Sequence, residues 1–131
     1  NGRRQNYKNI PIPRMRNTYI KPGSDKIEDM LKTIDRGVYV SKMGGGQVDT
    51  VTGDFVFSAV ESYLIENGEI KHPLKNITLT GNEKDVLQNI QAVSDDLNFI
   101  IGTCGKSGQG VPVTTGQPTI MIKDIIVGGM K

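Results

Sequence analysis

The chain has 131 residues, of which 36% are hydrophobic and 23% charged, and these values are ordinary for one globular domain. Its 16 basic and 14 acidic residues leave a net charge of +2, which is too small to favour nucleic acid or a membrane surface. No apolar run reaches the roughly 18 residues that a membrane-spanning helix needs. The single cysteine excludes an internal disulfide and indicates a reducing compartment, the cytoplasm.

Residues 1–16 form a basic segment that we expect to be an extended arm, called the basic arm below. Its basic residues all precede the first acidic residue of the chain, and they are Arg3, Arg4, Lys8, Arg14 and Arg16. Pro11 and Pro13 each fix φ and bias the preceding residue towards extended geometry. The arm could be solvated or could meet an acidic partner. Arg14 and Arg16 share one face of an extended chain, where they could hold a carboxylate or phosphate or simply face water.

Two amphipathic helices are expected. In the first, over residues 25–35, Asp25 begins a capping box and Gly37 is placed as the C-terminal stop. The second helix, over residues 83–93, follows Asn82, whose side chain is suited to cap its first turn. In both segments the apolar residues recur at helical intervals, which indicates that one face of each helix covers a sheet.

The other regular segments indicate strands. The longest candidate, residues 55–65, ends at Asn67-Gly68, a strong hairpin signal, and Pro73 ends the returning strand. Glycines at 44–46 should break a strand, and the glycine-rich segment 102–110 should form a loop. Further strands are expected over residues 15–20, 38–43, 76–80, 97–101, 111–113 and 119–127. The elements predict a single α+β domain over residues 1–131, mainly antiparallel β in an open-sheet or barrel-like arrangement, with two covering helices.

The segment 102–110 contains Gly105-Lys106-Ser107, which invites comparison with a phosphate-binding loop. The Walker pattern requires a glycine at the position of Ile100, and the segment after Ser107 contains Pro112 and cannot open the required helix. The glycine spacing also differs from that of the dinucleotide fingerprint. The sequence therefore excludes a nucleotide site here.

Cys104 is the candidate functional residue of this segment. Its small neighbours would leave the sulfur accessible and surrounded by backbone N–H groups, and Lys106 adds positive charge, which favours the thiolate. A thiolate can act as a nucleophile or as a metal ligand, but a free cysteine can equally be a small buried hydrophobe. Cys104 could pair with His72, the only histidine, although the place of His72 beside Pro73 favours an exposed turn residue. A catalytic zinc site needs about three protein ligands, and the cysteine and histidine donors total two, so the chain is short of a site.

Several motifs together resemble the C-terminal domain of one protein family. They are Pro13-Arg14-Met15-Arg16-Asn17-Thr18-Tyr19-Ile20, Gly45-Gly46-Gln47-Val48-Asp49-Thr50, Tyr63-Leu64-Ile65-Glu66-Asn67-Gly68, Cys104-Gly105-Lys106, Val111-Pro112-Val113 and Gly116-Gln117-Pro118-Thr119. On these motifs the chain is identified as a member of the TldD/PmbA family of metallopeptidases, once labelled modulators of DNA gyrase. It resembles the TldD branch, because the PmbA (TldE) branch lacks the segment that contains Cys104.

The resemblance implies a function that this chain would not perform alone. In the TldD branch an HExxxH helix in the N-terminal part supplies two zinc-binding histidines and a glutamate base, and the cysteine that matches Cys104 is the third zinc ligand. No HExxxH occurs in these residues. We therefore expect an absent N-terminal domain, no catalytic residue within this chain, and no activity of the fragment by itself. The bound zinc would activate a water for cleavage of peptides or unfolded proteins.

The resemblance also implies partners, and the residues leave two other functions open. The partner subunit would be a second copy, giving a homodimer, or a PmbA (TldE)-like subunit, giving a heterodimer. Substrate would bind by analogy as an added extended strand beside the sheet. One alternative is a non-catalytic protein-interaction module with a structural Cys104 and a basic arm that meets an acidic partner. The other is a thiol hydrolase that uses Cys104 and His72.

Overall fold

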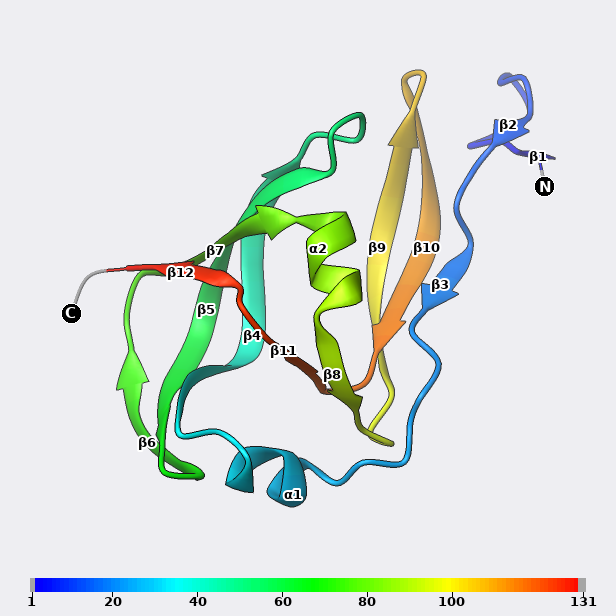
Figure 1. Ribbon diagram of the computed structural model, residues 1–131. Helices are drawn as coiled ribbons and strands as arrows, with labels where there is room; N and C mark the ends of the chain where they lie inside the picture. The colour runs from blue at the N-terminus through cyan, green and yellow to red at the C-terminus, as the bar shows by residue number, and fades with distance from the viewer. Residues whose placement is uncertain (1, 130–131) are drawn as a thin grey trace. The chain divides into compact units, whose positions relative to one another are not determined.

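The computed structural model describes residues 2–129, which form two compact units (Figure 1). Of these residues, unit 1 comprises 2–24 and Ser94–Thr119, and unit 2 comprises Asp25–Val93 and 120–129. Sheets in both units are open and mainly antiparallel, and two short helices accompany them, which confirms the predicted α+β class in its open-sheet form. No helix within the described residues is long and apolar enough to cross a membrane. The prediction of a single domain with a basic arm is not tested by the division into units and stays a prediction.

Unit 1 is built on a three-stranded sheet in the order β3-β10-β9. The strands are β3 (Asn17–Tyr19), β9 (Asn98–Lys106) and β10 (Gln109–Gln117). Figure 1 shows β9 and β10 as a long hairpin, with β3 parallel to β10 along its other edge. Val111 and Val113 of β10 are buried in this unit. Two short strands of the basic arm, β1 (Gly2–Arg3) and β2 (Ile12–Pro13), pair with each other.

The glycine-rich segment 102–110 is a hairpin, so its prediction as a loop is wrong. Ser107 and Gly108 both have positive φ, at 51° and 71°, and form a two-residue turn between β9 and β10. Such a turn matches the twist of the strands that it joins, and pairing with β10 then keeps the glycines of β9 extended. The glycine content of the segment does not predict this pairing, because the extended conformation depends on the neighbouring strand β10.

Unit 2 contains a larger sheet and a two-stranded one. The larger sheet has the order β12-β7-β5-β4, and β6 also pairs with β5. Its strands are β4 (Arg36–Val48), β5 (Asp54–Glu66), β6 (Glu69–Leu74), β7 (Ile77–Asn82) and β12 (Ile126–Gly128). The smaller sheet pairs β8 (Ile90–Val93) with β11 (Ile120–Ile122). Ile65 and Ile77 are buried in the core of this unit, at 2% and 6% exposure.

The predicted hairpin at Asn67-Gly68 is confirmed, whereas the predicted break at 44–46 is wrong. Asn67 and Gly68 have φ of 50° and 77°, the left-handed values of a tight two-residue turn. Strand β4 continues through the three glycines, with register shifts against β5. A Cβ on Gly46 would overlap the Phe57 ring and the carbonyl oxygen of Val56. Glycine at 46 therefore permits close approach of two strands instead of ending one.

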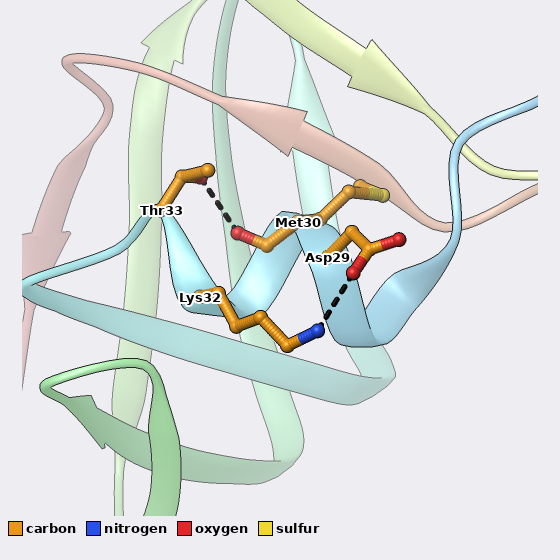
Figure 2. A network of polar contacts seen from close by, with 4 residues as sticks. All are labelled: Asp29, Met30, Lys32 and Thr33. Carbon is orange, nitrogen blue, oxygen red and sulfur yellow. Dashed lines mark hydrogen bonds and ion pairs between the residues drawn. The ribbon is translucent and has the colours of Figure 1, made fainter.

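Helix α1 (Ile27–Lys32) is shorter than predicted and lacks the predicted capping box. Lys26 is the N-cap and makes no side-chain cap, whereas Asp25 accepts the backbone N–H of Val93 at 2.9 Å. Figure 2 shows the polar contacts that do support the helix. Lys32 Nζ lies 2.8 Å from an oxygen of Asp29, and the hydroxyl of Thr33, the C-cap, donates to the carbonyl of Met30 at 2.7 Å. The predicted stop at Gly37 is wrong, because that residue already lies within β4.

Helix α2 (Glu83–Gln88) begins as predicted and ends early. The Asn82 side chain accepts the N–H of Lys84 at 3.1 Å, which confirms it as the N-cap. Residues 90–93, predicted as the end of this helix, instead form β8 and pair with β11, where Val93 lies opposite Ile120. A partner distant in sequence thus replaces a helical turn, because β-branched residues also suit a paired strand.

Candidate metal-ligand site

Cys104 lies on strand β9, opposite Val111 of β10, and not on a loop. Cys104 is half-buried, and its partner Val111 on β10 is 3% exposed. Strand β9 has another strand on one side only in the order β3-β10-β9. Cys104 is therefore held on a regular edge strand, with a side chain that is neither sealed in the core nor fully exposed.

Arg14 of the basic arm is buried beneath this hairpin, with 8% of its surface exposed. Its Nη2 donates to the carbonyl oxygen of Gln109 at 2.7 Å and, in a closer contact, to the carbonyl oxygen of Cys104. The Nε and Nη1 atoms are buried as well and have no hydrogen-bond partner in the described structure. The guanidinium thus links the main chains of both hairpin strands at the level of the cysteine.

Other residues of the basic arm also bond to the hairpin. Arg3 donates through Nη1 to the carbonyl of Met15 at 2.6 Å and through Nη2 to the carbonyl of Pro112 at 2.8 Å. The buried side chain of Gln109 accepts the N–H of Gln5 at 3.2 Å and donates to the carbonyl of Ile10 at 3.1 Å. Two of the arm's arginines and its main chain are therefore engaged within unit 1.

The surroundings of Cys104 favour its thiolate form. The backbone N–H of Met15, followed by the Arg14 guanidinium, lowers the pKa of the Cys104 thiol below its ordinary value. Partial burial acts in the opposite direction, and the charge of Lys106 makes a smaller contribution that also lowers the pKa. A thiolate is the form that binds metals and attacks electrophiles, so the structure prepares the sulfur for either role.

Cys104 belongs to no complete set of metal donors in the part of the chain that the structure describes. Among residues 2–129 no group of three or more His, Cys, Asp or Glu side chains could hold a metal ion. Two other residues considered in the sequence analysis are exposed: His72 on β6 of unit 2, and Arg16 in unit 1. The half-buried sulfur and its lowered pKa suit one zinc ligand, because zinc binds thiolate sulfur well. The fit extends to this one position.

Sequence reasoning missed two of the residues around Cys104. The sequence pattern predicts that Arg14 holds an anion or faces water, whereas the structure buries it. The glycine content predicts a loop around Gln109, whereas this residue lies in the paired hairpin and is 7% exposed. Both are long polar residues that are seldom fully buried, so their type gave no signal of burial. Only the hydrogen bonds between the basic arm and the hairpin bring them together.

Comparisons with known proteins identify relatives over almost the whole chain. Residues 1–129 match the model of the PmbA/TldA metallopeptidase C-terminal domain. A metalloprotease TldD homologue of Buchnera aphidicola subsp. Acyrthosiphon pisum is 47% identical over 131 residues, which cover 98% of this chain and 27% of that protein. A zinc metalloprotease TldD homologue of Saccharolobus solfataricus is 41% identical over 129 residues, which cover 98% of this chain and 29% of that protein. The chain therefore spans under a third of the length of these relatives.

Two solved structures share the fold. TldE of Thermococcus kodakarensis superposes with a TM-score of 0.75 at 25% identity, covering 98% of this chain and 27% of that one. A protein of Thermotoga maritima, titled a candidate modulator of a DNA gyrase, superposes with a TM-score of 0.68 at 30% identity, covering 86% of this chain and 24% of that one. Both solved chains extend well beyond the matched region.

Proposed function

The chain belongs to the PmbA/TldA metallopeptidase C-terminal domain family, and on that premise we propose that it supplies Cys104 as a zinc ligand to a TldD-type metallopeptidase. The observation that carries the proposal is the state of Cys104, half-buried on an edge strand with a lowered thiol pKa. The two remaining protein ligands and the general base would come from the HExxxH helix implied by the resemblance. The fragment by itself would be inactive, because one sulfur does not make a catalytic zinc site.

The residues of this chain have defined tasks in that proposal. Strand β9 holds the sulfur, the N–H of Met15 and the Arg14 guanidinium favour its thiolate, and the hairpin keeps its main chain rigid. Zinc bound there would supply Lewis acidity and an activated water for peptide hydrolysis. The open side of β9 would accept an extended peptide or unfolded segment through main-chain hydrogen bonds, a binding mode that tolerates many sequences.

The same proposal covers assembly and location. A PmbA (TldE)-like subunit has this fold, since TldE of Thermococcus kodakarensis superposes on 98% of the chain. A homodimer or a heterodimer with such a subunit would therefore bring together two copies of one architecture. A cytoplasmic location would keep Cys104 reduced and available for metal.

The test uses the longer protein that we propose carries this chain. We expect it to contain zinc and to cleave a fluorogenic peptide, and to lose cleavage on treatment with a chelator. Cys104→Ala and Cys104→Ser should lower zinc content and reduce cleavage by more than about 100-fold, since even residues that only support a ligand cost 10–100-fold. Thr103→Ala is the matched control, because Thr103 is exposed and its side chain points to the opposite face of the same strand.

Three results would contradict the proposal. Unchanged zinc content and cleavage in Cys104→Ala would remove Cys104 as a ligand. Cleavage that persists in chelator and disappears in His72→Ala would instead favour the thiol hydrolase. Nucleic-acid binding that weakens steeply with salt, without peptidase activity in the longer protein, would favour an interaction module that uses the basic arm.

A further inference from the structure

Arg14 is an unusual residue for the interior of a small unit. Arginine is almost never fully buried unless it is paired, and Arg14 has 8% of its surface exposed. In the part of the chain that the structure describes, no acidic side chain forms an ion pair with it. A buried cation without a carboxylate costs more than a well-packed apolar side chain of similar size, so simple packing does not account for its presence.

The contacts of Arg14 point to the main chain around Cys104. One nitrogen, Nη2, donates to two carbonyl oxygens, that of Cys104 on β9 and that of Gln109 on β10. These residues belong to opposite strands of the hairpin, on either side of the turn at Ser107 and Gly108. A single planar group therefore fixes the spacing of the two strands at the cysteine, because a guanidinium presents its donors in a rigid arrangement.

Arg14 is itself held in place from both sides along the chain. Pro13 pairs with Gly2 in the short ladder of β1 and β2, and the carbonyl of Met15 accepts a bond from Arg3 Nη1 at 2.6 Å. The guanidinium is thus attached to an anchored stretch of main chain, and its position is transmitted to the hairpin. The two remaining nitrogens, Nε and Nη1, are buried without an acceptor, and the group lies near enough to the sulfur to influence it.

We propose that Arg14 is the positioning residue for Cys104, holding the main chain on both strands of the hairpin so that the sulfur is presented in one fixed place. The inference rests on the proposed function, because that function gives the Cys104 sulfur a zinc ion to bind. It also assigns a role to the basic arm, which carries the residue that organises the ligand. Mutation of a residue that orients a metal ligand typically costs about 10–100-fold in metal affinity.

Metal binding by the longer protein tests this role, with Zn²⁺ and Co²⁺ as the probes. Zn²⁺ affinity is measured by competition with a chromophoric chelator, and the absorption of the Co²⁺-loaded protein reports the sulfur–metal bond. We expect Arg14→Met to weaken Zn²⁺ binding by about 10–100-fold and to weaken or shift the sulfur–cobalt band. Arg14→Lys should lie between wild type and Arg14→Met, because an ammonium keeps the charge and loses the planar fork. Arg16→Met is the matched control and should bind as wild type does, because Arg16 is exposed two residues along the same arm.

The outcomes separate this inference from the function on which it rests. A folded Arg14→Met protein with the affinity and cobalt spectrum of Arg16→Met would overturn the positioning role. Should Arg14→Met fail to fold, Arg14→Lys is judged by the same comparison, and binding equal to the control overturns the role. A Cys104→Ala protein that keeps both the affinity and the sulfur–cobalt band would instead overturn the proposed ligand itself.

Discussion

Two adjacent glycines of β4 should respond oppositely to the same substitution. Gly45 has open space around its Cα, because a Cβ there would meet no atom within 4 Å. A Cβ on Gly46 would overlap the carbonyl oxygen of Val56 and lie 2.6 Å from Cγ of Phe57. The carbonyl cannot rotate away without breaking the pairing of β4 with β5, in which Gly46 lies opposite Phe57. Gly46→Ala therefore forces the two strands apart, whereas Gly45→Ala does not.

The contacts at each glycine set the expected change in the free energy of unfolding. Overpacking of this kind typically costs about 1–3 kcal/mol, and the involvement of a backbone atom places Gly46→Ala at the upper end. In a chain of this length that cost should lower Tm by roughly 5–15 °C. Gly45→Ala should be neutral or should stabilise by up to about 1 kcal/mol, since alanine reduces the freedom of the unfolded chain at a compatible site.

Thermal and urea unfolding, followed by circular dichroism, measure both variants alongside wild type. The two proteins differ only in which neighbouring glycine carries the methyl group, so composition and propensity cancel in the comparison. Equal losses of stability in the two variants would refute the close-approach argument. They would show instead that any alanine is harmful in this stretch of strand, as intrinsic backbone preference alone would predict.

Two further predictions concern single polar residues. Asn82→Ala should lower the free energy of unfolding by about 1–2 kcal/mol in urea titrations, because it removes the cap on α2 and the bonds from Asn82 Nδ2 to Thr52 and Asp54. Asn82→Ser restores only the capping acceptor, so the part of the loss that it recovers is the share of the cap. No loss in the alanine variant would remove the cap as a stabilising contact. Asp96 should titrate below its ordinary pKa of 3.8 by NMR. Burial is the largest single influence and raises its pKa, but the hydrogen bonds from Thr119, from Ser94 and from its own backbone together lower the pKa by more. A carboxyl group whose pKa is lowered by folding stabilises the protein at pH values above its ordinary pKa, and this stability is lost as the pH falls through the lowered pKa. The difference in unfolding free energy between wild type and Asp96→Asn should therefore shrink in acid. A difference that stays constant from about pH 6 to 2 would contradict the lowered pKa of Asp96.

The sequence determined those features that depend on neighbouring residues alone. Asn67 and Gly68 accept left-handed backbone values, so their hairpin could be read from the two residues and the strand before them. Asn82 could be identified as an N-cap because a cap bonds to a backbone N–H two residues away. The predominance of β structure followed in the same way from local alternation and turn residues.

Only the tertiary structure decided the conformation of segments in which pairing with a strand distant in sequence overrides the local conformational preference. Residues 90–93 could continue a helix, and pairing with β11 makes them a strand, while the glycines at 44–46 and in 102–110 remain extended because β5 and β10 lie beside them. The burial of Arg14 beneath Cys104 joins residues 90 apart in the chain, a relation that no local pattern encodes. Strand pairing and burial are decided by the surface of the partner. The sequence could therefore single out Cys104 as a candidate, whereas the burial of Arg14 and Gln109 beside it emerged only from the fold.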